Sequence, residues 1–209
     1  MIDKPAPSIS DTEVANMIDV VFDLDGSSVP ANYPFALWPE IARYLPFLKD
    51  EKDTGFIPLK GSVSGEPLLL SRRTKLVLRV PVALAAQTAQ LSGKPLSIDG
   101  NVLTVGKCKE RQLQATTTLH AYLVESNLGE IEFLAAMKGK LQDMHISCNL
   151  ICDKQRIIKS TSRSLNGFGL VLHDLKPAAS ILIQSIGLGG ERHFGCGIFV
   201  PFKTISGLD

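Results

Sequence analysis

The predicted order of strands and helices is the feature that most limits the fold, because the same order occurs twice. In residues 17–113, hydrophobic alternation and turn residues predict strand, helix, strand, strand, helix and strand. Residues 114–209 repeat this order, with three strand segments in place of two between the helices. In each half the second helix starts at a proline and ends at a glycine, an asymmetry common in helices. These pairs are Pro81 with Gly93 and Pro177 with Gly187. The order predicts an α+β fold of two tandem ferredoxin-like (βαββαβ, RRM-like) lobes.

The first half begins with its clearest elements. Residues 17–24 form an apolar run closed by Asp25-Gly26, which predicts a buried strand. Asn32 and Pro34 then mark the start of a helix. Its apolar stripe at helical spacing consists of Leu37, Ile41, Leu45 and Leu48. The other predicted elements are strands over 56–63 and 68–80, a helix over 82–91, and a strand or hairpin over 96–105 turning at Asp99-Gly100.

The second half is predicted in the same way. An alternating strand covers 116–124, with Thr116, Thr118, His120 and Tyr122 on one face. Asn127 with Glu130 resembles a capping box, which opens a helix that continues through Leu141. The remaining predicted elements are strands over 146–151, 154–159 and 168–172, a helix over 178–186, and a closing strand over 198–200.

Composition places the chain among globular proteins. With 209 residues, 44% hydrophobic and 21% charged, it can form one large domain or two small ones. Residues 1–16 predict a flexible leader without the apolar core of a signal peptide. No apolar run reaches the roughly 18 residues that span a bilayer. The four cysteines are widely spread, so a reduced, cytoplasmic protein without membrane contact is expected.

A net charge of +1 hides an uneven distribution. Residues 1–60 carry five Lys/Arg against ten Asp/Glu, whereas residues 61–209 carry seventeen against eleven. The basic residues form two clusters: Arg72, Arg73, Lys75 and Arg79; and Lys154, Arg156, Lys159 and Arg163. A basic face suits a polyanion. Solvated strand edges are the alternative.

The stretch 186–202 contains five glycines in eleven residues. They are Gly187, Gly189, Gly190, Gly195 and Gly197, with Arg192 and His193 between them. Glycine allows positive φ and close backbone approach, so this density predicts a loop formed around a ligand or another chain. The loop follows a helix and precedes a strand, which is the reverse of a dinucleotide fingerprint, and it lacks the Gly-Lys-Ser/Thr of a P-loop. A glycine-rich hairpin with Cys196 and Phe199 in the core is the alternative.

No cofactor or metal site is predicted. Cys148 and Cys152 lie four residues apart in a strand-like run, but no second ligand pair accompanies them. Of the four histidines, His120 and His173 lie in or beside strands and are interpreted as structural. His145 lies at a helix-to-strand junction. Only His193, next to Arg192 in the glycine loop, has functional neighbours.

The C-terminal glycine loop and the two similar halves resemble those of a known family. The C-terminal Gly187-Leu-Gly189, five residues, then Gly195-Cys-Gly197 match the G-h-G-x5-G-h-G loop of the RAMP superfamily, where h is apolar. With two ferredoxin-like halves, the chain is similar to CRISPR-associated repeat-RNA endoribonucleases, the sixth Cas family. Phrases such as Leu76-Val-Leu-Arg-Val-Pro and Gly195-Cys-Gly-Ile-Phe-Val-Pro resemble its compact, myxobacterial-type subtype. The resemblance spans about residues 17–203.

This resemblance implies that the protein binds CRISPR repeat RNA and cuts it to give mature guide RNA. The implied chemistry is metal-independent: the ribose 2′-OH attacks the adjacent phosphate and leaves a 2′,3′-cyclic phosphate. General acid–base catalysis and a cation near the phosphate serve such a reaction. The RNA contacts are expected from Arg72, Arg73, Lys154, Arg156, Arg192 and the five glycines. Other Cas proteins of an effector complex are further expected partners.

The first helix departs from the family's pattern. Relatives usually have a histidine near its start, as in Pro-x-Asp-His, whereas this chain has Pro30-Ala-Asn-Tyr33 and no histidine in its first half. Tyr33 and His193 are therefore the predicted catalytic residues. A tyrosine with its ordinary pKa of about 10 is a slow acid–base near neutral pH, so slow cleavage is expected.

Two rival functions remain open. One is a non-catalytic RNA-binding RAMP subunit that retains RNA without cutting it. The other is a small-molecule enzyme that uses the glycine loop to bind the phosphate of a nucleotide.

Overall fold

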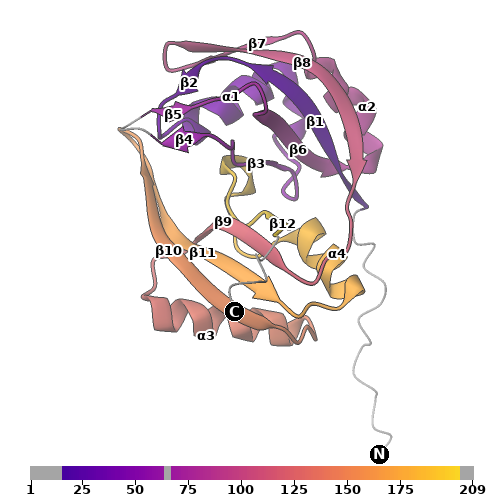
Figure 1. Ribbon diagram of the computed structural model, residues 1–209, viewed down its shortest axis with the longest axis vertical. Coiled ribbons are helices and arrows are strands. Elements are labelled where there is room, and N and C mark those ends of the chain that lie inside the picture. Colours follow the sequence, from indigo (N-terminus) through magenta and orange to yellow (C-terminus); the bar gives the residue numbers. More distant parts are fainter. Residues whose placement is uncertain (1–15, 64–66, 203–209) are drawn as a thin grey trace, which may run out of the picture.

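The computed structural model describes residues 16–63 and 67–202. All but the last residue of the predicted leader lies outside this range. Two antiparallel sheets form the framework, one in each half of the chain (Figure 1). The strands of the first sheet lie between residues 17 and 112, and those of the second between 119 and 201.

The first sheet has the order β3-β6-β1-β8-β7. Its strands are β1 (Met17–Asp25), β3 (Gly55–Ile57), β6 (Lys75–Pro81), β7 (Pro95–Ile98) and β8 (Asn101–Gln112). Without the edge strand β7, this is the order of a ferredoxin-like sheet, in which the first and third strands pair at the centre. The hairpin β7–β8 turns at Asp99-Gly100, where both residues have positive φ (45° and 84°), as predicted for a tight hairpin.

The second sheet repeats this arrangement with the order β10-β11-β9-β12. Its strands are β9 (Leu119–Glu125), β10 (Asn149–Lys159), β11 (Ser164–His173) and β12 (Phe199–Pro201). The prediction of tandem ferredoxin-like lobes is confirmed. The predicted strands 146–151 and 154–159 are in fact one strand, β10, with an irregular register between Cys152 and Gln155.

Four α-helices within residues 16–63 and 67–202 complete the two lobes. They are α1 (Pro34–Tyr44), α2 (Ala85–Thr88), α3 (Glu130–Asp143) and α4 (Pro177–Ile186). Helix α1 begins at Pro34, and the predicted apolar stripe is buried, but only Leu37 and Ile41 lie in α1; Leu45 follows its last residue and Leu48 lies in a 3₁₀ turn. The predicted helix 82–91 is α-helical only in α2, with 3₁₀ turns at Val82–Leu84 and Ala89–Leu91. The capping box was wrong: Gly129 caps α3 without a side-chain hydrogen bond.

Two long predicted strands in the first half are interrupted. Only Gly55–Ile57 and Lys75–Pro81 join the main sheet. Pro58 has no amide hydrogen for a ladder, and Thr74 closes a turn by accepting a hydrogen bond from the Ser71 amide at 3.0 Å. The intervening segments form a small separate sheet, in which β5 (Leu68–Leu69) pairs with both β2 (Ser28–Val29) and β4 (Ser62–Val63).

Each lobe has its own hydrophobic core between its sheet and its helices. Figure 1 shows α3 along the outer side of the second sheet, away from the first lobe. Two smaller apolar clusters join the lobes. One contains Val21 and Val77 of the first sheet with Ile198, just before β12. In the other, Phe35 of α1 packs against Leu123, Leu165 and Cys196 of the second lobe. The helix-free faces of the two sheets are therefore partly in contact, and the remaining space between them forms pockets.

Candidate nucleic-acid interface

The glycine-rich loop, residues 187–197, is folded tightly on itself. Gly187, Gly189, Gly195 and Gly197 have φ between 65° and 84°, a region that residues with a β-carbon rarely adopt. A β-carbon on Gly197 would lie 2.4 Å from the Leu188 carbonyl oxygen, and one on Gly187 would lie 2.2 Å from the Gly197 carbonyl oxygen. These glycines therefore allow two stretches of the loop's own backbone to touch.

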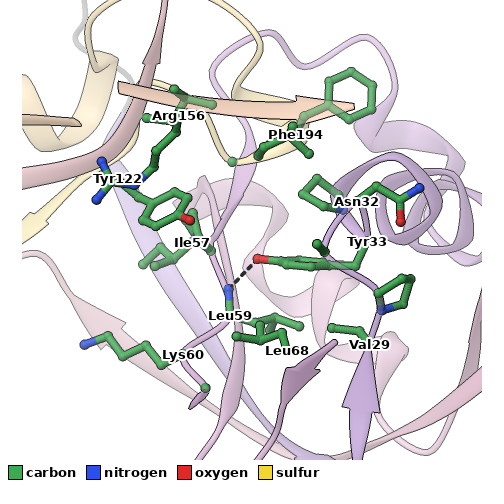
Figure 2. A pocket seen from close by; sticks show the side chains of 18 of the residues that line it. Val29, Asn32, Tyr33, Ile57, Leu59, Lys60, Leu68, Tyr122, Arg156 and Phe194 are labelled. Atoms are coloured by element: carbon green, nitrogen blue, oxygen red, sulfur yellow. Dashed lines mark hydrogen bonds between the residues drawn. The ribbon is translucent and has the colours of Figure 1, made fainter. Parts of the chain in front are cut away.

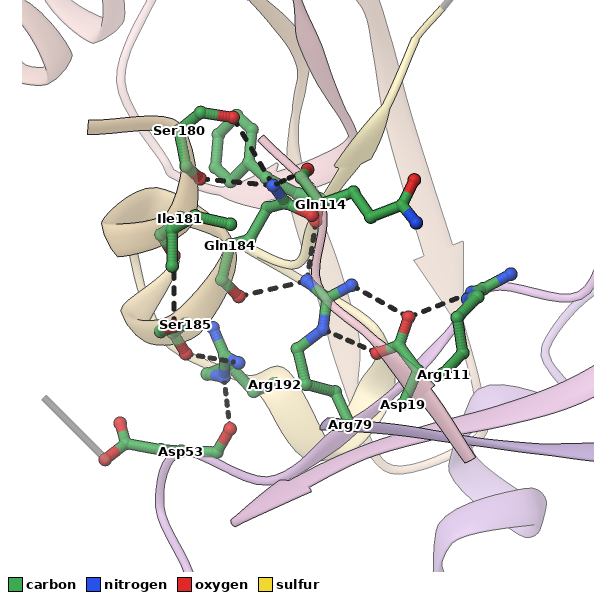
Figure 3. A network of polar contacts seen from close by, with 11 residues as sticks. Asp19, Asp53, Arg79, Arg111, Gln114, Ser180, Ile181, Gln184, Ser185 and Arg192 are labelled. Atoms are coloured by element: carbon green, nitrogen blue, oxygen red, sulfur yellow. Dashed lines mark hydrogen bonds and ion pairs between the residues drawn. The ribbon is translucent and has the colours of Figure 1, made fainter. Parts of the chain in front are cut away.

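Arg192 fixes this loop from inside the protein. It is 5% exposed, and it donates hydrogen bonds from Nε to the Asp53 carbonyl at 2.9 Å and from Nη2 to the Ser185 carbonyl at 3.1 Å (Figure 3). Burial, with nearby Arg79, lowers the pKa of Arg192 to about 10. The predicted contact between Arg192 and RNA needs correction, because this guanidinium is enclosed and already bound to main-chain oxygens.

His193 is likewise held against the first lobe. Its ring stacks on Trp38 of α1 with centroids 4.1 Å apart, and its Nε2 donates to the Glu51 carbonyl at 3.0 Å. His193 does not line the large cleft described below. The structure thus places this predicted catalytic residue in the joint between the lobes.

A second arginine, Arg79 of β6, ties both ends of the glycine loop to the first lobe. It is completely buried and pairs with Asp19 of β1, Nε to Oδ1, at 2.8 Å. Its Nη1 donates to the carbonyls of Gln184 at 2.9 Å and Phe199 at 2.6 Å, one on each side of the loop (Figure 3). Arg111 also pairs with Asp19, with 2.9 Å between Nη2 of Arg111 and Oδ2 of Asp19. The prediction that Arg79 belongs to a basic surface was wrong.

A cleft with a volume of about 1120 Å³ lies between the lobes. Tyr33 lines it just before α1, and its Oη accepts a hydrogen bond from the Leu59 amide at 2.8 Å (Figure 2). Burial raises the pKa of Tyr33 above its ordinary value. The phenol therefore keeps its proton near neutral pH, which is unfavourable for a proton acceptor. In Figure 2 the hydroxyls of Tyr33 and Tyr122 point toward one another across the pocket.

The second sheet supplies the charged wall of this cleft. Arg156 lies over the Tyr122 ring, 4.4 Å from Cζ to the centroid, and its Nη2 donates to Asp153 Oδ2 at 2.8 Å. Its Nη1 donates to the Lys154 carbonyl at 3.0 Å. An arginine has five N–H donors, so this guanidinium can still bind a phosphate oxygen. Lys154 itself is exposed.

His120, interpreted from the sequence as structural, lines the same cleft. Its Nε2 is 3.4 Å from Asp153 Oδ2. Burial lowers the pKa of His120 below 6.5, while Asp153 acts in the opposite direction. The signal for His120 was its position in the alternating strand, which puts it on the same face as Tyr122. Which of the sheet's faces is open could not be known from that alternation.

A second hollow of about 460 Å³ continues the basic surface. It is lined by Lys60, Arg73, Lys75 and Arg111 among others. Ile57, Pro58, Lys60 and Val200 line both hollows, so the two adjoin. Arg72 and Arg73 are exposed in the turn before β6. In the glycine loop only Gly189 and Gly190 are exposed, and within the described residues their amides donate no hydrogen bond.

Other site types are not found in the part of the chain that the structure describes. Residues 16–63 and 67–202 contain no group of three or more His, Cys, Asp or Glu side chains arranged to hold a metal ion. Cys148 and Cys152 are unpaired and half-buried, and burial raises the pKa of both thiols. None of the described helices is long and apolar enough to cross a membrane.

Comparison with known proteins identifies relatives of the whole chain. The family described as "Cas6 Crispr" matches residues 18–204. A curated relative, the CRISPR-associated endonuclease Cas6 of Myxococcus xanthus, is 32% identical over 186 residues, which cover 88% of this chain and 81% of that protein.

Solved structures share the fold at low sequence identity. A Cas6-related protein of Pyrococcus furiosus has a TM-score of 0.63 at 11% identity, with 88% of this chain and 98% of that chain covered. Cse3 of Thermus thermophilus, solved with an RNA representing a pre-cleavage complex, has a TM-score of 0.55 at 10% identity over 88% and 98% of the two chains.

Proposed function

Because this chain belongs to the Cas6 family, we propose that it is an endoribonuclease that binds CRISPR repeat RNA and cuts it to make guide RNA. Its relative from Myxococcus xanthus is named an endonuclease, and a protein of similar fold has been solved with RNA. The observation that carries the proposal is the cleft between the lobes, where Arg156 lies beside Tyr122 and His120. Cationic and aromatic side chains together suit single-stranded RNA.

The proposed reaction is attack of a ribose 2′-OH on the adjacent phosphate, without a metal ion. In this reaction Arg156 offsets the negative charge that develops on the phosphate oxygens. Tyr33 contributes as a hydrogen-bond donor, since its Oη accepts from Leu59 and its own hydrogen remains for a phosphate oxygen. His193 is assigned to the joint between the lobes, because Glu51 and Trp38 already hold it.

The RNA path runs along the exposed basic residues. Arg72, Arg73 and Lys154 are exposed, and Arg73 lines the hollow that adjoins the cleft. The free amides of Gly189 and Gly190 offer a further phosphate contact. The other three glycines and Arg192 shape the loop. Repeat transcripts arise in the cytoplasm, where we place this activity, with other Cas proteins as partners of the product.

The test is incubation of the full chain with RNA of the CRISPR repeat from the same genome, in EDTA. Cleavage with a 2′,3′-cyclic phosphate end supports the proposal, and a 2′-deoxy nucleotide at the mapped cut site should prevent it. Binding without cleavage would instead favour the non-catalytic RAMP subunit. One observation favours that second candidate: Tyr33 and His193, the two predicted catalytic residues, both make structural hydrogen bonds.

A further inference from the structure

The geometry points to His120 as the residue that accepts the proton of the attacking 2′-hydroxyl, with Asp153 as its positioning residue. This inference rests on the proposed function, because it names the proton acceptor of that reaction. All four histidines of the chain lie within the described residues, and only His120 lines the cleft. His145 is exposed at the end of α3, His173 pairs with Asp174 at the end of β11, and His193 lies under Trp38.

Asp153 holds two cleft residues with one oxygen. Its Oδ2 lies 2.8 Å from Arg156 Nη2 and 3.4 Å from His120 Nε2. The carboxylate thus fixes a neutral base beside a cation. A phosphate bound by Arg156 would bring the adjacent ribose toward His120.

The fold makes room for this arrangement at a single residue. Asp153 and Arg156 come from β10 and His120 from β9, and β11 lies between those two strands. The side chains of Asp153 and Arg156 can extend over β11 toward His120 because β11 has Gly169 at that point. A β-carbon on Gly169 would lie 2.5 Å from Arg156 Nη1 and 2.8 Å from Asp153 Oδ2. Gly169 and the irregular register of β10 thus allow the Asp153 carboxylate to contact both Arg156 and His120.

The surroundings of His120 favour its neutral form. The charged groups that face it, Asp153 and Arg156, both come from β10. Its neighbours across the ladder, Val171 of β11 and Val200 of β12, are uncharged, and the Phe202 ring lies 5.2 Å away between centroids. Burial lowers the pKa of His120 below 6.5, so at pH 7 the imidazole has a lone pair that can accept a proton.

The 2′-O–H proton moves to an imidazole nitrogen of His120 as the bond from O2′ to phosphorus forms. The bond from phosphorus to O5′ breaks, and O5′ takes a proton from water. The hydroxide that remains takes the proton from His120 at the end of the reaction, which restores the neutral imidazole. Asp153 then faces an imidazolium and stabilises it, while Arg156 stabilises the charge on the non-bridging oxygens.

The experiment measures single-turnover cleavage of labelled repeat RNA in EDTA by the full chain. His120→Ala should cut about 10²–10⁴-fold more slowly, the usual loss for a positioned acid–base residue. His120→Gln should fall similarly, and it guards against misfolding of the alanine variant. His173→Ala removes the histidine of the other His–Asp pair and should leave the rate unchanged. Affinity for 2′-deoxy repeat RNA should stay within about threefold for all three variants.

The pH profile tests the role of Asp153. The wild-type rate should fall as pH drops through a value below 6.5, where His120 becomes protonated. Asp153 favours the charged imidazole, so Asp153→Asn lowers the pKa of His120 further and should move this acid limb to lower pH, with a slower plateau. The inference would be overturned if His120→Ala cut RNA at the wild-type rate or if His120→Gln lost RNA binding. It would also be overturned if the acid limb of Asp153→Asn stayed at the wild-type pH. A wild-type protein that binds but never cuts would instead refute the proposed function, and His120 with it.

Discussion

The glycine-rich loop and the cleft face of the second sheet were both places where RNA contacts were predicted, and their construction is opposite. In the loop, Arg192 and His193 point into the protein and bind main-chain carbonyls. On the sheet, Arg156 and His120 point into the cleft and bind a carboxylate side chain. A dense run of glycines therefore indicates close packing of backbone before it indicates a ligand.

The largest expected effect is a loss of stability where Arg79 holds the two ends of the glycine-rich loop. Arg79→Met would leave Asp19, which is 3% exposed, with only the half-exposed Arg111, and would free the carbonyls of Gln184 and Phe199. Breaking a buried, hydrogen-bonded ion pair typically costs about 3–5 kcal/mol. Thermal unfolding should show this loss. Lys75→Met breaks the exposed pair with Asp23 and serves as the control, with little change in Tm expected.

The second effect compares two glycines of the same loop. Gly197→Ala forces a β-carbon to within 2.4 Å of the Leu188 carbonyl at φ 65°, so it should lower the free energy of unfolding by about 2–4 kcal/mol. Gly190→Ala meets no atom within 4 Å and should be nearly neutral. Denaturant unfolding of both variants measures the difference. Equal stability of the two would mean that the loop is not packed as described.

The order of elements was predictable because it depends on local patterns. Apolar stripes, Pro81, Pro177 and Gly187 indicate where helices start and end, and each pattern is visible within a few residues of sequence. The strand breaks were missed because they also depend on neighbours in the folded protein: Thr74 Oγ1 donates to the Lys60 carbonyl at 2.8 Å, and the irregular register of β10 arises in its pairing with β11.

The site was less predictable than the fold, for a physical reason. Arg79 and Arg156 are both arginines of predicted strands and belong to the two predicted basic clusters. One is completely buried and the other lines the cleft, because the interface between the lobes covers only part of each sheet. His120 was missed for the same reason: alternation gives the face of a strand but not what lies opposite it.

The third effect concerns RNA affinity and tests the basic surface of the first lobe that adjoins the cleft. Arg72→Ala with Arg73→Ala should reduce the slope of log K against log salt by about 0.7 for each phosphate that no longer has a cationic partner. The matched control, Lys138→Ala with Lys140→Ala, removes two exposed charges from α3 on the outer side of the second sheet (Figure 1). The measurement is binding of 2′-deoxy repeat RNA at several salt concentrations. Both double variants lose two positive charges, so a smaller slope for the Arg72/Arg73 variant alone indicates local phosphate contacts. Equal slopes in both double variants would place the RNA elsewhere.

The smallest effect is expected at Tyr33 of the first lobe, which is buried like the loop residues yet lines the cleft like Arg156 and His120. Tyr33→Phe leaves the Leu59 amide without its acceptor, which should lower the free energy of unfolding by about 1–2 kcal/mol. Losing one neutral hydrogen bond to the phosphate should slow cleavage about tenfold. The pH profile should not change, since burial raises the pKa of Tyr33 above its ordinary value and the phenol keeps its proton throughout. Tyr44→Phe, at a half-buried tyrosine in α1, is the control for stability and rate. If Tyr33→Phe instead removes a titration from the profile, then Tyr33 and not His120 moves the proton.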